Sequence, residues 1–457
     1  MDHNPILQLL DSATDFQRMR LALEGGEGPV AAFGVAANAK AHLCASLART
    51  RQVLFVTATD VTAVQLHESA RLFGVRAELF LPRETPLVYV HAASGENRGA
   101  RISALSALLL GEPCVVAASA AALMQALAPK GAFANSQLSL TAGDTLEPRS
   151  LIERLVSAGY ERVEMVEGRG QCAARGDLVD VFAPGEEYPV RIEFFGDEID
   201  QMRTFDAVSQ RSVEQIQTIL IRPALETPQP KELTQKVLKR IAGRAGLSDQ
   251  EDAWSEGIAS VGGDVLLPLL YKKTETLLDY LREDAILIVD EALLIDEALR
   301  TEQLRFAETV KAMLERDEGV PEQGALERGA NETLERLHTG RTALFYALSR
   351  THPQFSPREI VNLESRGAPQ FMGAFDEIAR EIKRLNQQGE KTVIYAGEQT
   401  EELLQNLADY DAKATASNEL PEELPTGKTL ILPGQLTRGF SYPQLKLNIF
   451  CEYEITG

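Results

Sequence analysis

The sequence has few cysteines and no long hydrophobic segment. Its four cysteines stand far apart, none in C-x-x-C spacing, and its six histidines form no H-x-x-x-H or H-E-x-x-H pair. We therefore predict no metal site and reduced thiols. No apolar run reaches the roughly 18 residues that a membrane-spanning helix requires, and the N-terminus shows no basic region followed by an apolar one. These absences predict a cytoplasmic protein with no membrane partner.

Positive charge is also scarce. Lysine and arginine together number 46 against 67 aspartates and glutamates, which gives a formal net charge of −21. Nucleic-acid binding requires concentrated positive charge that displaces counterions from phosphates, and no Lys/Arg cluster with interleaved aromatic residues is present. The composition argues against duplex binding by this chain alone and favours protein partners.

What the sequence does contain is an alternation of strands and helices. A chain of 457 residues is too long for one core and suggests about three domains. Short apolar runs at residues 30–33, 52–57 and 114–118 alternate with helical segments, which predicts an α/β domain with a largely parallel sheet. Helical periodicity returns after residue 231, so we expect residues 231–300 to close this sheet and to make the preceding segment an inserted α+β domain.

Residues 30–47 have the order strand, small-residue loop, lysine and helix that surrounds a P-loop, whose pattern is G-x-x-x-x-G-K-[ST]. Gly34 and Lys40 are in register with this pattern. Ala39 replaces the second glycine and adds a Cβ where backbone amides would surround a phosphate. Ala41 replaces the residue whose hydroxyl would hold Mg²⁺. We predict a degenerate, inactive nucleotide site, with no catalytic residue and no cofactor in this chain.

An acidic pair follows the apolar strand at residues 285–289. In a P-loop ATPase, Asp290 and Glu291 would hold Mg²⁺ and orient water. The simpler interpretation is that two carboxylates precede the helix expected at residues 292–313, whose dipole favours them. Because Ala39 and Ala41 face this pair across the loop, we favour the simpler interpretation.

Two runs with alternating apolar and polar residues, 178–182 and 190–194, flank a turn-forming sequence and predict a β-hairpin. Helix 149–158 would precede this sheet, and strand 218–222 would close it. Arg175, Arg191 and Phe195 stand out here, because guanidinium groups beside an exposed aromatic ring are typical of protein-binding anchors.

The strings ARGDLVDVF and YPVRIEFFGDEIDQMRTFD in this region resemble domain 2 of the bacterial transcription-repair coupling factors, a domain shared in outline with the excision-repair protein UvrB. The resemblance implies that this domain docks the repair protein UvrA and that Arg175, Arg191 and Phe195 occupy contact positions. The short link at residues 89–98 leaves no room for the DNA-separating hairpin of UvrB. With the degenerate P-loop, this favours the coupling factors over UvrB.

The resemblance implies four segments. Residues 1–136 would be a UvrB-like domain 1A, residues 137–222 the inserted domain 2, residues 223–340 domain 1B, and residues 341–457 a small α/β domain 3. Strands of domain 3 are expected at residues 343–348, 359–363, 391–396, 429–432 and 446–453.

The chain would then be an N-terminal piece of a longer protein. That protein would continue into an RNA-polymerase-binding domain and an ATP- and Mg-dependent motor that translocates on DNA, and a C-terminal domain would mask the UvrA surface. Two alternatives remain from the residues themselves. One is a UvrB-like nucleotide-binding enzyme that uses Lys40 with Asp290 and Glu291, and the other is a scaffold in which residues 170–206 are only a spacer.

Overall fold

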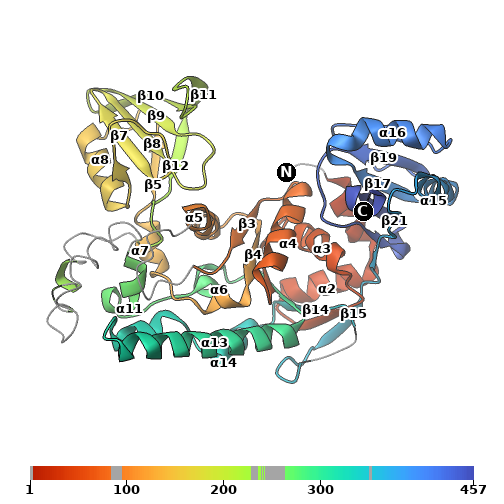
Figure 1. Ribbon diagram of the computed structural model, residues 1–457, viewed down its shortest axis with the longest axis horizontal. Helices are drawn as coiled ribbons and strands as arrows, with labels where there is room; N and C mark the ends of the chain where they lie inside the picture. Colours follow the sequence, from red (N-terminus) through yellow and green to blue (C-terminus); the bar gives the residue numbers. More distant parts are fainter. Residues whose placement is uncertain are drawn as a thin grey trace.

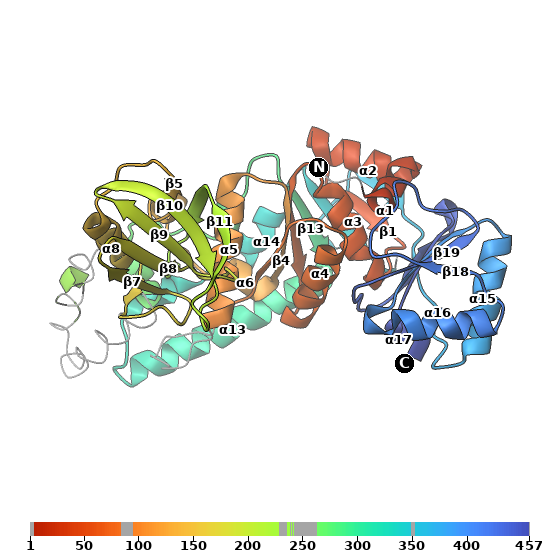
Figure 2. The ribbon, with the colours of Figure 1, turned by 90° about the horizontal axis from the view of Figure 1, so that it is seen from above.

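The structure, a computed structural model, describes residues 4–83, 95–227, 263–348 and 352–456, together with 235–237, 239 and 241. Three sheets lie in a row along the molecule (Figure 1 and Figure 2). The central sheet is flanked by the inserted domain at one end and by the C-terminal module at the other. No helix in these described ranges is both long and apolar enough to span a membrane.

The central sheet, here called sheet A, has seven strands in the order β15-β1-β14-β13-β2-β4-β3, and every pairing is parallel. The predicted α/β class with a large parallel sheet is therefore confirmed. Strands from both sides of the insertion contribute to it: β1 (Val30–Phe33), β2 (Gln52–Thr57), β3 (Ala77–Phe80), β4 (Cys114–Ser119), β13 (Ile286–Asp290), β14 (Thr342–Tyr346) and β15 (Glu359–Asn362).

Two hydrophobic layers cover the faces of sheet A, and side chains alternate between them along each strand. In β2, for example, Val53 and Phe55 belong to one layer and Leu54 and Val56 to the other. The first layer contains α2 (Thr14–Gly25), α3 (Lys40–Leu47) and α4 (Asp60–Leu72); the second contains α5 (Gly95–Leu110), α6 (Ala120–Met124), α13 (Ala292–Glu315) and α14 (Ala330–Leu337).

The inserted domain contains a six-stranded sheet, sheet E, in the order β11-β10-β9-β8-β7-β6. The predicted hairpin is present as the antiparallel pair β8 and β9. The expected closing strand differs, because β12 (Thr218–Ile221) pairs with β5 (Leu138–Thr141) in a separate two-stranded sheet. The other elements are α8 (Pro148–Ser157), β6 (Glu161–Arg162), β7 (Gln171–Arg175), β8 (Leu178–Phe182), β9 (Val190–Phe195), β10 (Glu198–Phe205) and β11 (Ser212–Ile216).

The C-terminal module is built on sheet F, in the order β16-β20-β21-β17-β19-β18. The sequence placed strands 343–348 and 359–363 in this module, which is wrong: β14 and β15 are hydrogen-bonded to β1 in sheet A. The module comprises β16 (Arg366–Gly367), α15 (Phe375–Gln387), β17 (Lys391–Tyr395), α16 (Thr400–Asp409), β18 (Ala414–Ala416), β19 (Lys428–Leu432), β20 (Phe440–Tyr442), β21 (Leu447–Cys451) and α17 (Glu452–Thr456).

Short elements complete the chain. The N-terminal helical segment is divided into α1 (Pro5–Gln8), η1 (Leu9–Ser12) and α2, because Ala13 is extended. The remaining elements are η2 (Ala37–Ala39), α7 (Lys130–Ala134), η4 (Gly263–Leu266), α11 (Leu267–Leu270), α12 (Leu277–Tyr280), η5 (Pro321–Leu326), η6 (Gly397–Gln399) and η7 (Pro443–Leu445). The predicted link at residues 89–98 falls largely within 84–94, outside the described residues.

The C-terminal module shares a hydrophobic core with sheet A across α3. His42 on this helix lies against the rings of Phe73, Phe440 and Tyr442. Its Nε2 is 3.0 Å from the carbonyl oxygen of Ile6, and its Nδ1 is 3.3 Å from the Tyr442 hydroxyl. Burial lowers the pKa of His42 to about 4, so the imidazole is neutral at physiological pH. The helix that follows the P-loop-like sequence is therefore an internal contact between two modules.

Candidate functional sites

The outer face of sheet E carries all three predicted anchor residues. In β9, the side chains at 190, 192 and 194 are buried, so Arg191, Glu193 and Phe195 point to the opposite face. The register places Glu193 opposite Leu178, and Leu178 opposite Arg175. Residues directly opposite each other in an antiparallel sheet share a face, so Arg175 lies on this outer face as well.

Phe195 is the most prominent member of the group. It ends β9 just before the turn at Gly196, whose positive φ of 65° favours glycine, and it is 83% exposed. A phenylalanine so fully in water contributes little to folding and can bury a large apolar area against a partner.

Arg175 is also accessible. It lies at the end of β7, its residue is exposed, and its Nε donates a hydrogen bond of 2.9 Å to the carbonyl oxygen of Glu164. This bond fixes the direction of the guanidinium group and leaves its terminal nitrogens on the surface.

Arg191 differs from the free cation that the sequence suggested. Its Nε and Nη2 donate to the two carboxylate oxygens of Asp180 at 2.7 and 2.8 Å, and Nη2 also reaches the amide oxygen of Gln210 at 3.1 Å. The guanidinium lies 4.4 Å from the centre of the Phe205 ring, and the side chain is 15% exposed. The hydrogen bond with Asp180 is the main cause that raises the pKa of Arg191.

Sequence reasoning missed the charged residues that surround these anchors. Arg203 forms an ion pair with Glu193, and the amide of Gln201 donates to Glu193 at 2.6 Å. All three lie on the outer face by register. The period-two pattern of β10 could have placed them on a face, but the partners across the sheet require the register.

The second candidate site is the P-loop-like segment between β1 and α3. Gly34 has a positive φ of 69°, and a Cβ added there would lie 2.7 Å from the side-chain oxygen of Asn362. Lys40 forms a direct ion pair with Asp290 at the end of β13. Burial raises the pKa of Asp290, although the charge of Lys40 opposes the rise. The structure thus brings Lys40 and Asp290 together, as the sequence predicted, but the two charges neutralise each other.

Backbone amides of this loop bond to other parts of the chain. The N–H of Ala36 donates to the hydroxyl of Ser365 at 2.7 Å, and that hydroxyl donates to the Gly34 carbonyl at 3.0 Å. The N–H of Val35 donates to the carbonyl of Tyr346 at 3.3 Å. A P-loop needs these amides for phosphate, so the residues present do not fit a nucleotide.

Glu291 and Asn38 form two further hydrogen bonds between the P-loop-like region and other parts of the chain. Glu291 adopts a positive φ of 54° before α13, and its carboxylate accepts a bond of 2.7 Å from the N–H of Ala347. The amide of Asn38 donates to the carbonyl of Gly439 in the C-terminal module at 2.9 Å. Ala39 and Ala41 are buried beneath. This P-loop-like segment is a packed junction between sheet A and sheet F.

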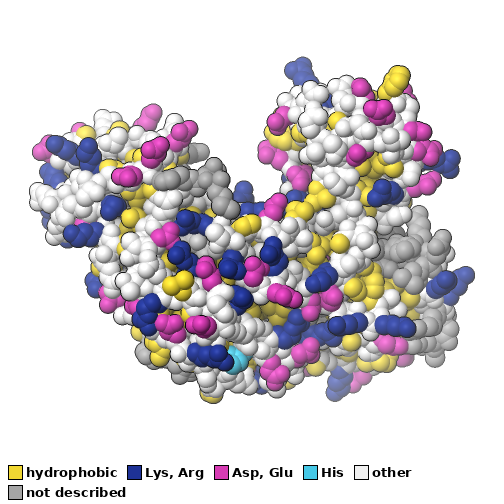
Figure 3. Space-filling view, turned by 180° about the vertical axis from the view of Figure 1, so that it is seen from behind, with side chains coloured by type: hydrophobic (Ala, Val, Ile, Leu, Met, Phe, Trp, Pro, Cys, Tyr) yellow, Lys and Arg dark blue, Asp and Glu magenta, His cyan; other side chains and the backbone are white. Residues whose placement is uncertain are grey.

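One face of the molecule shows how its surface charges are distributed. Figure 3 shows basic and acidic side chains interspersed over the face seen from behind, without a broad region of positive charge. This face therefore lacks the continuous positive charge that a DNA duplex requires.

Comparison with known proteins bears directly on the inserted domain. A family model described as the UvrB interaction domain matches residues 138–226. Over 98% of its length the chain is 29% identical to a transcription-repair-coupling factor of Bacillus subtilis, and over 99% it is 30% identical to one of Mycobacterium bovis. A Staphylococcus aureus relative is 25% identical over 78% of the chain.

The resemblance to the transcription-repair coupling factors is confirmed. The chain spans about two fifths of the length of the first two coupling factors, 40% and 39%, which is consistent with an N-terminal fragment. The match to the UvrB interaction domain covers the strands that carry Arg175, Arg191 and Phe195. The roles of individual residues in this chain stay predictions.

Proposed function

We propose that this chain is the repair-recruiting module of a transcription-repair coupling factor and that its inserted domain binds UvrA through the outer face of sheet E. The match of residues 138–226 to the UvrB interaction domain carries the proposal, and the exposed Phe195 on that face supports it. In the longer protein, RNA polymerase and DNA would be engaged by the remaining parts, which would supply the ATP- and Mg-dependent motor, and a C-terminal domain would mask this face.

The module itself would have no nucleotide hydrolysis. Sheet A would be a UvrB-like domain split by the insertion, with the nucleotide loop closed. The direct contact of Lys40 with Asp290 and the bond between Ala36 and Ser365 support this part of the proposal. The alternative, an enzyme that uses Lys40 with Asp290 and Glu291, would need Lys40 and the loop amides to change partners.

Each anchor would act in its own way. Phe195 would bury in the partner as the central apolar contact, and truncation of such an anchor costs about 2–4 kcal/mol of binding energy. Arg175 would offer its terminal nitrogens to a carboxylate on UvrA. Arg191 would present a guanidinium already oriented by Asp180, which reduces the conformational entropy lost on binding.

Titration of purified UvrA onto the chain tests the proposal. Phe195→Ala should weaken the dissociation constant by roughly 30-fold or more, the equivalent of a lost anchor. Val208→Ala is the matched control, because Val208 is 95% exposed in the turn between β10 and β11, at the opposite end of β10. Equal loss in both variants, or full affinity in Phe195→Ala, would exclude the proposed face.

Arg191 needs a separate design, because its removal leaves Asp180 buried without a partner. Asp180 is 4% exposed, so Arg191→Ala alone would confuse folding with binding. The double variant Asp180→Ala, Arg191→Ala removes both charges. If the double variant folds with normal cooperativity but binds UvrA as weakly as Arg175→Ala does, the guanidinium contributes to binding; unchanged affinity would restrict Arg191 to a structural role.

Isothermal titration with Mg-ATP distinguishes the enzyme alternative. No heat of binding at millimolar nucleotide is expected, since the loop amides are engaged within the chain. Micromolar binding would instead support the nucleotide-binding enzyme. A chain that neither binds nucleotide nor forms a complex with UvrA in size-exclusion chromatography would be the scaffold alternative.

A further inference from the structure

The edge strand β3 presents free backbone groups. Among the described strands β3 pairs only with β4, and the N–H of Val115 donates to the carbonyl of Arg76 while Ala77 lies opposite Val115. Along a strand, the N–H and C=O groups of successive residues point alternately to its two sides. The backbone groups of Ala77 and Leu79 therefore point away from β4. The carbonyl of Ala77 accepts a hydrogen bond from His67. The N–H of Ala77 and both groups of Leu79 have no partner in the described ranges.

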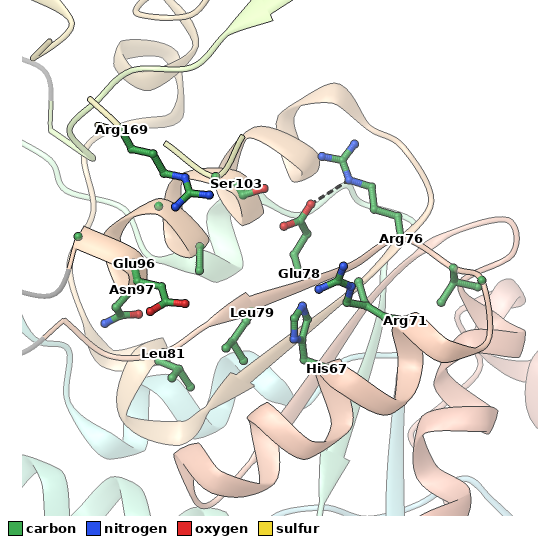
Figure 4. A pocket seen from close by; sticks show the side chains of 17 residues that line it. His67, Arg71, Arg76, Glu78, Leu79, Leu81, Glu96, Asn97, Ser103 and Arg169 are labelled. Atoms are coloured by element: carbon green, nitrogen blue, oxygen red, sulfur yellow. Dashed lines mark hydrogen bonds and ion pairs between the residues drawn. The ribbon is translucent and has the colours of Figure 1, made fainter. Parts of the chain in front are cut away.

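This edge forms the floor of a trough of about 830 Å³. One wall is α4, which contributes His67 and Arg71, and the other is α5, which contributes Glu96 and Ser103. The loop of the inserted domain that carries Arg169 closes one end. Figure 4 shows His67 and Arg71 directed from α4 toward Glu78 and Arg169 directed inward from the opposite side.

The charges in the trough favour an acidic occupant. Arg76 is neutralised by ion pairs with Glu78, at 2.9 Å, and with Glu112. Arg71 forms no ion pair with a described residue. Arg169 donates its Nε to the carbonyl of Glu186, and its guanidinium lies 5.4 Å from the centre of the Phe182 ring, but it forms no ion pair with a described residue either. Glu96, on the rim, is the acidic lining residue outside these pairs. Two exposed arginines, Arg71 on α4 and Arg169 on the loop at one end, therefore border the open strand edge.

We propose that the β3 edge is a docking site for an extended, acidic polypeptide segment of a partner protein, which adds to sheet A as a further strand. Backbone bonds to Leu79 and Ala77 would supply affinity, and Arg71 and Arg169 would select acidic side chains, which is the division of roles in strand addition. A phosphodiester is the weaker fit, because it cannot pair with a strand edge and the rim carries Glu96. The site is separate from the sheet E face and does not depend on UvrA binding.

Fluorescence anisotropy with labelled peptides of about ten residues tests the site. The probes alternate valine and threonine and carry zero, two or four glutamates. Affinity for the 457-residue chain should rise with the number of glutamates and fall with added salt. Arg71→Glu and Arg169→Glu should each weaken binding roughly fivefold or more, as expected when an ion pair becomes a repulsive one. Arg154→Glu, an exposed position on α8 outside the trough, is the matched control and should leave binding unchanged.

Backbone pairing is tested independently of charge. Ala77→Pro removes an outward N–H without a ladder bond, which edge strands tolerate, and should weaken binding although no charge changes. A peptide N-methylated at alternate residues should bind as poorly. In hydrogen exchange, the Leu79 amide should be unprotected in the free chain and protected by peptide.

Three results would each overturn the proposal. These are no binding by any probe below about 1 mM, binding insensitive to Ala77→Pro and N-methylation, or a Leu79 amide already protected without peptide. The last would show that the chain covers this edge itself. Preference for a phosphate oligomer over the acidic peptide would assign the trough to nucleic acid instead.

Discussion

Replacing Lys40 with methionine should destabilise the fold, because its charge is part of the structure. The side chains of Lys40 and Asp290 are only 9% and 7% exposed, and their ion pair joins α3 to the end of β13. Methionine keeps most of the aliphatic stem, so the substitution removes mainly the charge. Asp290 then becomes a buried carboxylate without a counter-ion, and breaking a buried pair from one side costs about 3–5 kcal/mol.

The loss should depend on pH. Burial already raises the pKa of Asp290, with Lys40 as the main opposing influence, so Lys40→Met should raise this pKa further. A carboxyl whose pKa is higher in the folded state binds more protons there between the folded and unfolded pKa values, so its contribution to stability falls as pH rises through that window. The variant should approach wild-type stability near pH 4, about the ordinary aspartate pKa, and show the full loss at neutral pH.

Urea unfolding followed by circular dichroism, at acidic and at neutral pH, measures the effect. Asp290→Asn and the double variant Lys40→Met, Asp290→Asn complete a thermodynamic cycle. The double variant should lose less free energy of unfolding than the two single variants lose together, because it buries no unpaired charge. Wild-type stability of Lys40→Met at neutral pH would refute the reasoning. So would a thermal shift with Mg-ATP that the variant abolishes, since Lys40 would then be a ligand-binding residue.

Three further predictions concern other buried polar groups. Arg101→Met should lower the free energy of unfolding, measured with urea, by about 3–5 kcal/mol. Arg101 donates two hydrogen bonds of 2.6 and 2.9 Å to the buried carboxylate of Glu226, which would be left without a counter-ion. Glu327→Gln should stabilise the protein at pH 8 or above and have little effect near pH 5 in thermal unfolding; burial and the nearby Glu302 raise the pKa of Glu327 to about 8, so the wild-type chain loses stability as pH rises toward that value. Ser365→Ala should cost about 1–3 kcal/mol by leaving a loop amide unpaired, and Ser365→Thr should recover part of this loss in the same denaturation assay.

The sequence was sufficient for elements whose formation depends on local pattern. Strands β1 and β2 begin and end where the apolar runs predict, and the hairpin of β8 and β9 follows from alternation on either side of a turn. These segments combine one buried face or a fully buried strand with clear turn residues at their ends. The α/β class follows from the same local signals.

Long-range pairing could not be predicted in this way. Strands β14 and β15 resemble the start of a new α/β unit, yet they pair with β1, more than 300 residues earlier in the chain. A buried parallel strand shows only an apolar run, which does not specify its neighbour. The partner of β12 could not be read from its local pattern either, because this strand pairs antiparallel with β5 and not with a strand of sheet E.

At the candidate sites, too, the sequence predicted what depends on local pattern and missed what depends on long-range pairing. The sequence identified Phe195 as exposable, and period-two alternation placed it on one face with Arg191. It could not show that Arg191 is held by Asp180, because the seven-residue connection between the two strands, 183–189, leaves the register open. An arginine that the sequence suggests as a binding residue can therefore also be held by a carboxylate on the neighbouring strand, and only the register shows that carboxylate.

The P-loop-like segment shows how the backbone amides of such a loop can serve an internal interface. A P-loop without nucleotide leaves several backbone amides at one place, and buried amides must find partners. Here a serine hydroxyl and strand carbonyls meet that need, and Ala39 and Ala41 supply the small apolar surface on which the C-terminal module packs. We therefore expect that introducing the glycine and the hydroxyl alone would not create nucleotide binding, because phosphate would have to displace both Ser365 and the carboxylate of Asp290. The substitutions visible in the sequence are accompanied by a second set of contacts, at Ser365 and Gly439, that no P-loop pattern contains.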